Sequence, residues 1–166
     1  MYTIVGLGNP GAEYAKTRHN TGRIIAERLG FRVLDDFMNK SGSALLKISQ
    51  PKVQSAKLII IHDDLDLPLG KFKISFGKSA GGHRGVASII KALKTQEFVR
   101  IRVGISPSTP SGKLKKPMGE KKVLDFILSS FKRKELEIIK KQTKKIAKAI
   151  SITESEGVEA AMNMFN

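Results

Sequence analysis

A run of four large apolar residues, Leu58-Ile59-Ile60-Ile61, constrains the fold of this chain more than any other feature. A β-branched run without polar alternation is typical of a strand covered on both faces, as in the centre of a parallel sheet. We therefore expect a buried strand over residues 57–62. Similar patterns predict strands over residues 2–5, 71–75 and 98–105.

Apolar residues recur at helical spacing between and after these strands. The segments concerned are 21–29, 45–48, 85–93, 136–150 and 158–165, while residues 106–119 are rich in Pro, Ser, Gly and Lys and indicate a loop. Strands that alternate with helices predict an α/β fold. We expect a single domain over residues 1–166, with three α/β/α layers and a mixed, mostly parallel sheet.

The composition excludes several classes of protein. The chain has 166 residues and no cysteine, which excludes disulfide scaffolds, cysteine-ligated zinc and thiol catalysis. No apolar run approaches the ~20 residues that a membrane-spanning helix needs, and the N-terminus does not resemble a secretory signal. We expect a cytoplasmic protein with no membrane contact.

Positive charge is concentrated in the C-terminal third of the chain. The formal net charge is +15, and the excess is densest in three lysine-rich groups at 113–122, 132–134 and 140–148. Such a stripe is typical of proteins that bind nucleic-acid phosphates, although a solvated helix face gives a similar pattern. Aromatic residues are 6% of the chain, which favours recognition of a folded RNA over stacking on single strands.

A glycine-rich turn follows the first predicted strand. Its sequence, Gly6-Leu7-Gly8-Asn9-Pro10-Gly11, fits G-x-G-x-x-G, but the polar residues after it lack the apolar helix of a dinucleotide-binding fold. His19 lies farther along this polar segment, where α/β proteins place reactive side chains, although an isolated surface histidine is the commoner explanation.

Two more polar motifs follow later elements. His62-Asp63-Asp64-Leu65-Asp66 comes after the central strand, and three interpretations stay open: a Mg²⁺ site, a carboxylate that orients a catalytic histidine, or aspartates that cap a turn. Gly81-Gly82-His83-Arg84 precedes a helix, where backbone N–H groups suit a phosphate or an oxyanion. An ordinary glycine-rich helix start explains this motif equally well.

Taken in order, these motifs resemble bacterial-type peptidyl-tRNA hydrolase over nearly the whole chain. The matching stretches are 4–20 (IVGLGNPGAEYAKTRHN), 37–42 (FMNKSG), 62–70 (HDDLDLPLG), 80–85 (AGGHRG) and 99–105 (VRIRVGI). The resemblance implies a monomeric enzyme, without a metal, a cofactor or an obligate protein partner, that cuts the ester between a peptide and the 3′-terminal ribose of tRNA. Its partner is peptidyl-tRNA, and its work is the recycling of tRNA after aborted translation.

The resemblance also implies roles for individual residues. His19 matches the general base and Asp63 the carboxylate that orients it. Asn9 and Asn39 match amides that position the water and the peptidyl backbone, Met38 lines the substrate crevice, and Tyr14 lies at the tRNA 3′ end. Around the second glycine motif, we expect substrate or tRNA contacts from Gly81, Gly82, His83 and Arg84.

This chain departs from the family pattern at two places. Only residues 31–36 connect the first helix to the FMN motif, where the family has room for an additional hairpin, so we expect a smaller sheet. Arg84 replaces a substrate-contacting asparagine, and an arginine adds a full charge and accepts no hydrogen bond. Two alternatives to the hydrolase remain open: a non-catalytic RNA-binding relative, and a metal-dependent nuclease that uses Asp63, Asp64 and Asp66.

Overall fold

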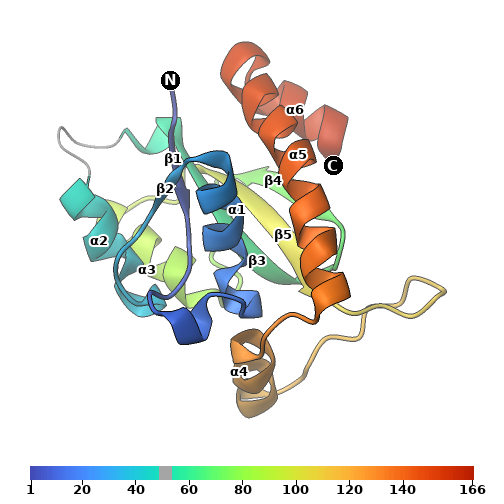
Figure 1. Cartoon of the computed structure of the whole chain (residues 1–166). Helices are drawn as coiled ribbons and strands as arrows, with labels where there is room; N and C mark the ends of the chain where they lie inside the picture. The colour runs from blue at the N-terminus through green and yellow to red at the C-terminus, as the bar shows by residue number, and fades with distance from the viewer. Residues whose placement is uncertain (49–53) are drawn as a thin grey trace.

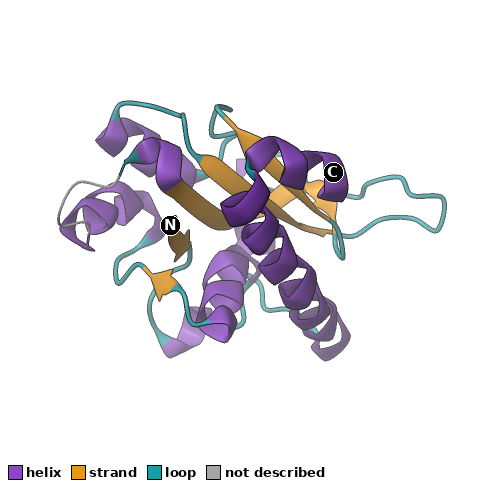
Figure 2. Cartoon of the chain, turned by 90° about the horizontal axis from the view of Figure 1, so that it is seen from above, coloured by secondary structure: helices purple, strands orange, loops and turns teal. Residues whose placement is uncertain are grey.

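The computed structural model describes residues 1–48 and 54–166 and contains one five-stranded sheet with helices on both faces (Figures 1 and 2). The strands are β1 (Thr3–Gly6), β2 (Arg32–Val33), β3 (Leu58–Pro68), β4 (Phe72–Phe76) and β5 (Val99–Ser106). They lie in the order β2-β1-β3-β5-β4, with β4 antiparallel to β5 and the other pairs parallel. The predicted mixed, mostly parallel sheet is confirmed.

Helices cover the two faces of the sheet unequally. The helices are α1 (Thr21–Leu29), α2 (Ser41–Ile48), α3 (Arg84–Leu93), α4 (Glu120–Leu128), α5 (Arg133–Glu156) and α6 (Val158–Phe165). Short 3-10 turns are η1 (Ala12–Tyr14), η2 (Arg18–Asn20), η3 (Met38–Lys40) and η4 (Ser55–Lys57). One apolar core joins the sheet to α1, α5 and α6, and a second joins it to α2 and α3, which makes the three expected layers.

The central strand supplies both cores. Ile59 and Ile61 pack into the core beneath α1 and α5, whereas Leu58 and Ile60 pack into the core beneath α2 and α3. Successive side chains of a strand point to opposite faces, so an all-apolar run buries every residue when both faces are covered. Each such side chain contributes about 1.5–3 kcal/mol by its burial, which explains why this run dictates the architecture.

Three parts of the chain differ from the sequence expectations. The two-residue strand β2, which pairs with β1, is not among the predicted strands. β3 continues through the acidic motif to Pro68, because β5 supplies a ladder partner for Asp63 and Asp64. Residues 120–128 form the unpredicted helix α4, which lies below the sheet in Figure 1. Five of its nine residues are apolar, but charged residues fill its first turn and none of the apolar side chains is fully buried.

The edge strand β4 is covered by a side chain rather than by another strand. The Asn166 amide donates to the Ile74 carbonyl at 2.9 Å and accepts from the Ile74 N–H at 2.7 Å.

Among the described helices, none combines the length and apolar character that crossing a bilayer requires.

Close backbone packing fixes α1 against the centre of the sheet. The Leu7 N–H donates to the Ile61 carbonyl at 3.0 Å, and the Arg23 N–H donates to the Leu7 carbonyl at 2.8 Å. Gly22 lies at this crossing, where a Cβ atom would overlap the Ile61 carbonyl oxygen and approach the Leu7 nitrogen to 2.8 Å. The glycine therefore sets the distance between α1 and β3.

We expect Gly22→Ala to destabilise the protein by about 1–3 kcal/mol, the usual cost of overpacking a close contact. Helix propensity alone predicts the opposite sign, because alanine is favoured over glycine by about 1 kcal/mol in a helix. Urea unfolding, with Arg28→Ala on the exposed face of α1 as control, measures the difference. A midpoint at or above that of the unmodified protein would contradict the close-packing explanation.

Candidate active site

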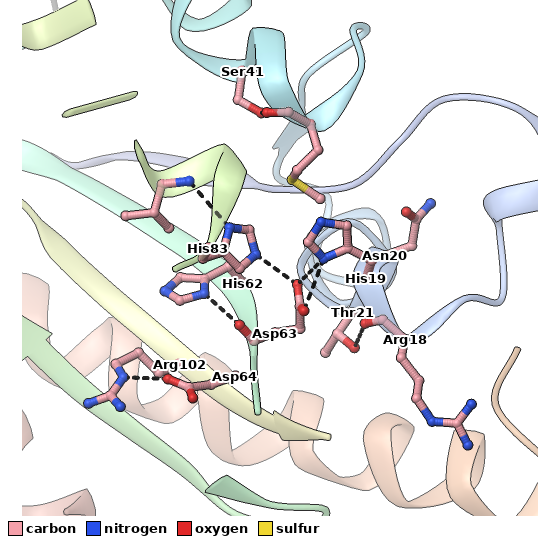
Figure 3. A network of polar contacts seen from close by, with 12 residues as sticks. Arg18, His19, Asn20, Thr21, Ser41, His62, Asp63, Asp64, His83 and Arg102 are labelled. Atoms are coloured by element: carbon pink, nitrogen blue, oxygen red, sulfur yellow. Dashed lines mark hydrogen bonds and ion pairs between the residues drawn. The ribbon is translucent and has the colours of Figure 1, made fainter. Parts of the chain in front are cut away.

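The strand alternation of β3 places Asp63 and His62 on opposite faces of the sheet. Asp63 has the parity of Ile59 and Ile61 and points to the side of α1, while His62 points to the side of α3. Both side chains are buried, with 3% and 2% of the residue exposed. A buried carboxylate requires charged or hydrogen-bonding partners, and three imidazole rings gather at this point (Figure 3).

His19 lies in the turn η2, between β1 and α1, and faces Asp63. Its Nδ1 is 3.0 Å from each carboxylate oxygen of Asp63. A carboxylate only accepts, so Nδ1 carries the proton and Nε2 has a free lone pair, an assignment that follows from the partners. The structure thus brings together the two residues that the sequence identifies as base and orienting acid.

His83 binds the other side of the same carboxylate. It caps α3, where its Nδ1 accepts from the Val86 N–H at 3.3 Å, and its Nε2 lies 2.9 Å from Asp63 Oδ1. Because the cap occupies the Nδ1 lone pair, the proton resides on Nε2 and is donated to Asp63. The ring of His83, for which the sequence predicts a substrate contact, binds Asp63 and also lines the cavity described below.

His62 completes the cluster from beneath. Its Nδ1 donates to the Asp63 carbonyl at 2.7 Å, and its ring centre lies 4.7 Å from that of His83. Its Nε2 is buried and has no hydrogen-bond partner among the described residues. Burial first, and then the charge of His83, lower the pKa of His62 well below its ordinary value. His62 is therefore a neutral ring at physiological pH.

The pKa values of the central pair move in opposite directions. Burial alone would raise the pKa of Asp63, but the charges and hydrogen bonds of His19 and His83 hold it well below its usual range. Burial alone would lower the pKa of His19, but the Asp63 carboxylate more than offsets this and raises it, while Arg84 acts weakly in the opposite sense. Asp63 thus stays ionised and stabilises a proton on His19.

A cavity of about 630 Å³ opens beside the cluster. Of the ten residues predicted for the site, six line the cavity: His19, Asp63, Gly81, Gly82, His83 and Arg84. The opposite wall is α4, whose Val123, Leu124 and Ile127 face the same space. The helix that sequence analysis missed therefore contributes an apolar wall to the site.

Two arginines of β5 also line this cavity, and the sequence pattern assigns no role to them. Arg100 and Arg102 share the parity of His62 in the sheet register, so they point to the same face. Arg102 Nε donates to Asp64 Oδ2 at 2.7 Å. Arg100 is only 4% exposed and has no carboxylate within ion-pair distance among residues 1–48 and 54–166. The signal in the sequence that could have identified them is their spacing: two arginines two residues apart on a strand point to the same face of the sheet.

Arg84 lies at the rim of the cavity. It begins α3, and its Nη2 is 3.4 Å from Glu120 Oε1 at the start of α4. Both side chains are mostly exposed, so the pair is held weakly. The Arg84 charge nevertheless lowers the pKa of His19 and so disfavours a proton there.

The other four predicted residues form a second group. Asn9 Oδ1 accepts from the Met38 N–H at 2.8 Å, the exposed Asn39 follows Met38, and Tyr14 meets Phe37 edge-on at 6.2 Å between ring centres. None of the four lines the cavity beside the histidine cluster.

Asn20 joins this group to the histidine cluster. It is 1% exposed and follows His19, and its amide exchanges hydrogen bonds of 2.8 and 2.9 Å with the backbone of Asn9. Sequence analysis does not predict a role for Asn20, and its position next to His19 was the only signal for it.

The three interpretations of the acidic motif separate in the structure. Asp63 orients a histidine. Asp64 caps a turn through the Asp66 N–H at 2.7 Å, and Asp66 pairs with Lys116. The interpretation as an orienting carboxylate therefore applies to Asp63, and the interpretation as a turn cap applies to Asp64.

One set of atoms has the composition of a metal site. Three ligand atoms, one each from His19, His83 and Asp63, lie within 4.8 Å of one another, and two imidazoles with a carboxylate can bind Zn²⁺ or Fe²⁺. The nitrogens that face the carboxylate are His19 Nδ1 and His83 Nε2. Both nitrogens, however, carry the protons that they donate to Asp63, and a metal needs their lone pairs. The Val86 N–H holds His83 in that tautomer. The hydrogen-bond pattern therefore suits proton transfer better than metal binding.

Comparison with known proteins gives consistent matches along the whole chain. A family model described as "Peptidyl-tRNA hydrolase" matches residues 3–36 and 33–166. Peptidyl-tRNA hydrolases of Thermodesulfovibrio yellowstonii and Carboxydothermus hydrogenoformans are each 36% identical, over 100% of this chain and 99% and 98% of the relatives. The crystal structure of the Acinetobacter baumannii peptidyl-tRNA hydrolase superposes with a TM-score of 0.85 at 27% identity, covering 100% of this chain and 94% of that one.

These matches also locate where the chain is shortened. The alignment with the Thermodesulfovibrio relative spans 195 positions against 166 residues here, so at least 195 − 166 = 29 positions have no counterpart. The two matched segments meet at residues 33–36. The break in the family-model match therefore lies at the short connection before the FMN motif.

We expect Asp63→Asn to lower the pKa of His19, because burial and the Arg84 charge remain while the carboxylate charge is lost. An NMR titration of the His19 ring measures the shift. Asp66→Asn, which removes an exposed carboxylate from the same motif, is the control and should leave the titration unchanged. An unchanged His19 titration in Asp63→Asn would show that Asp63 does not control the base.

Proposed function

The chain belongs to the peptidyl-tRNA hydrolase family and hydrolyses the ester bond of peptidyl-tRNA, and we propose that His19 is its general base and Asp63 the carboxylate that orients it. The observation that carries this assignment is the His19–Asp63 hydrogen bond, which directs a protonated Nδ1 to the carboxylate and leaves Nε2 free beside the cavity. We further propose that the enzyme recycles tRNA from aborted translation.

The reaction needs one water molecule and one base. His19 Nε2 takes a proton from water as the oxygen attacks the ester carbonyl. Asp63 stabilises the imidazolium that results. When the tetrahedral intermediate collapses, the C–O bond to ribose breaks and His19 returns the proton to the departing 3′ oxygen. The products are a peptide carboxylic acid, which loses its remaining proton to solvent and becomes a carboxylate, and tRNA with a free 3′ hydroxyl, and His19 is neutral again.

The remaining site residues position the substrate. Asn9 and Asn39 are proposed to orient the water and the peptidyl backbone, with Met38 and Tyr14 near the tRNA 3′ end. Gly81, Gly82 and His83 are proposed to contact substrate at the cavity. The two glycines have positive φ angles of 58° and 83°. No atom of the described residues beyond their chain neighbours lies within 4 Å of where a Cβ atom would stand on either, so a ligand can approach the backbone there.

The charge distribution supports binding of the tRNA backbone. The basic residues of α5 and its start are exposed along the helix: Lys132, Arg133, Lys134, Lys140, Lys141, Lys144, Lys145 and Lys148. We call this set the lysine stripe. An arginine buried without a carboxylate among the described residues, Arg100, supports entry of an anionic group of the substrate into the cavity. A peptidyl-tRNA substrate meets both requirements.

The intact base and acid favour an enzyme over a non-catalytic RNA-binding relative, because binding alone has no need for a buried imidazole–carboxylate pair. We propose that residues 1–166 form a single domain that works as a monomer in the cytoplasm, without a cofactor or an obligate protein partner.

We expect His19→Ala to reduce kcat by about 10²–10⁴-fold, the usual loss for a general base, and to leave tRNA affinity unchanged. Release of peptide from an N-blocked aminoacyl-tRNA, measured with EDTA present, tests both the base and the metal-independent reaction. His62→Gln is a useful comparison, since that ring is hydrogen-bonded to the backbone carbonyl of Asp63 and not to its carboxylate oxygens. Near-normal turnover of His19→Ala would reject the assignment, and activity that EDTA removes and Mg²⁺ restores would reject the metal-independent reaction.

We expect Arg84→Asn to raise KM, because an exposed cation beside the glycine motif is lost, and to raise kcat. The reason for the second effect is that the Arg84 charge opposes protonation of His19. Its removal raises the pKa of His19, so the acidic limb of the pH–rate profile moves to higher pH. Steady-state kinetics at several pH values and salt concentrations measure these changes. If kcat, KM and the limb all stay the same, Arg84 has no role in the reaction.

A further inference from the structure

Arg18 makes more polar contacts than any neighbouring residue of the turn that carries His19. Its Nη1 donates to Ser129 Oγ at 2.7 Å and to the Ser130 carbonyl at 2.9 Å. Its Nη2 donates to both carboxylate oxygens of Glu135, at 3.0 and 2.9 Å. The residue is 7% exposed, so this side chain is an internal connection rather than a surface charge.

Two aromatic rings enclose the same guanidinium. The Arg18 Cζ lies 4.7 Å from the ring centre of Phe126 and 5.3 Å from that of Phe131. Phe126 belongs to α4, and Phe131 lies just before α5. Cation–π contacts of this kind restrict an arginine that is already hydrogen-bonded in its plane.

Backbone hydrogen bonds join the same two segments that the Arg18 side chain connects. The Arg18 N–H donates to the Ser129 carbonyl at 3.1 Å, and the Phe131 N–H donates to the Lys16 carbonyl at 2.9 Å. These bonds form an antiparallel bridge between Thr17 and Ser130. The segment before His19 is thus paired with the connection between α4 and α5.

Glu135 extends this connection into α5. One of its oxygens also accepts from the Lys132 N–H at 2.7 Å, at the start of the helix. The Glu135 carboxylate therefore binds two partners: the backbone N–H of Lys132 at the start of α5, and Arg18, the residue next to His19. The same helix carries the lysine stripe.

We infer that Arg18 is a positioning residue for the hydrolysis: its guanidinium fixes the turn that bears His19 to the start of α5, so that the helix proposed to hold tRNA also sets the orientation of the base toward Asp63. This inference rests on the proposed role of His19. It assigns to Arg18 no contact with substrate.

Arg18→Lys tests the inference, because lysine keeps the charge but cannot donate in two directions within one plane. We expect kcat to fall about 10-fold to 100-fold, as a misplaced catalytic group typically does, with KM for peptidyl-tRNA unchanged. If His19 loosens from Asp63, the acidic limb of the pH–rate profile should also move to lower pH. The charged or titratable groups that face His19 are Asp63, His83 and Arg84, and all three stay in place.

A purely structural role gives a different result. If Arg18→Lys only unfolds part of the molecules, kcat falls but the acidic limb of the pH–rate profile stays at the same pH. That outcome would overturn the inference, and unchanged kinetics would overturn it too. Arg32→Lys is the matched control, since Arg32 donates to the Ile48 carbonyl away from the site and should keep both kcat and the limb. Should Arg18→Lys fail to fold, Glu135→Gln retains the Arg18 contacts to Ser129 and Ser130 and should shift the limb in the same direction by less.

His19→Ala separates this inference from the proposed function. Loss of activity in His19→Ala together with an unmoved limb in Arg18→Lys rejects only the positioning role. Activity retained in His19→Ala rejects the assignment of the base itself.

Discussion

One buried carboxylate organises this molecule. Asp63 is the only acidic side chain that is fully buried in the described part of the chain, and an unpartnered charge in that position would cost several kcal/mol. Its oxygens are instead satisfied by two imidazole N–H groups that arrive from separate turns, η2 and the cap of α3. The strand that delivers Asp63, the turn that delivers His19 and the helix that orients His83 must all be placed correctly for that charge to be stable.

The sheet could be predicted because its determinants are local. The Leu58–Ile61 segment is apolar on both faces, and it forms the central strand as expected. Gly30 ends α1 with a φ of 71°, as its place after an apolar periodic segment suggests. The pairing of His19 with Asp63 came from the resemblance to the hydrolase family, because the acidic motif alone left three interpretations open. The alternation of β3 explains why Asp63 and His62 point to different faces.

Other features depend on contacts that no local pattern encodes. The helix α4 is only nine residues long, and its apolar residues are divided between the edge of the core, at Phe126 and Ile127, and the cavity, at Val123 and Leu124, so it has no sustained apolar face. His83 follows two glycines, a context that predicts a ligand contact, and no local pattern shows that the Val86 N–H and the Asp63 carboxylate also bind its two ring nitrogens. The extension of β3 through acidic residues requires β5 as its partner, which lies far along the chain, beyond β4 and α3. In each case tertiary contacts outweigh local preference.

The amide of Asn166 has a consequence for how the molecule meets its own copies. β4 is the outer strand on one side of the sheet, and an outer strand offers free backbone groups to which a strand of another molecule can add. At Ile74 those groups are already occupied by a side chain that donates and accepts as a neighbouring strand would. Asn166 thereby interrupts the row of free backbone groups at Ile74, the middle residue of β4. A strand of another molecule cannot pair with β4 along its whole length, which opposes edge-to-edge aggregation.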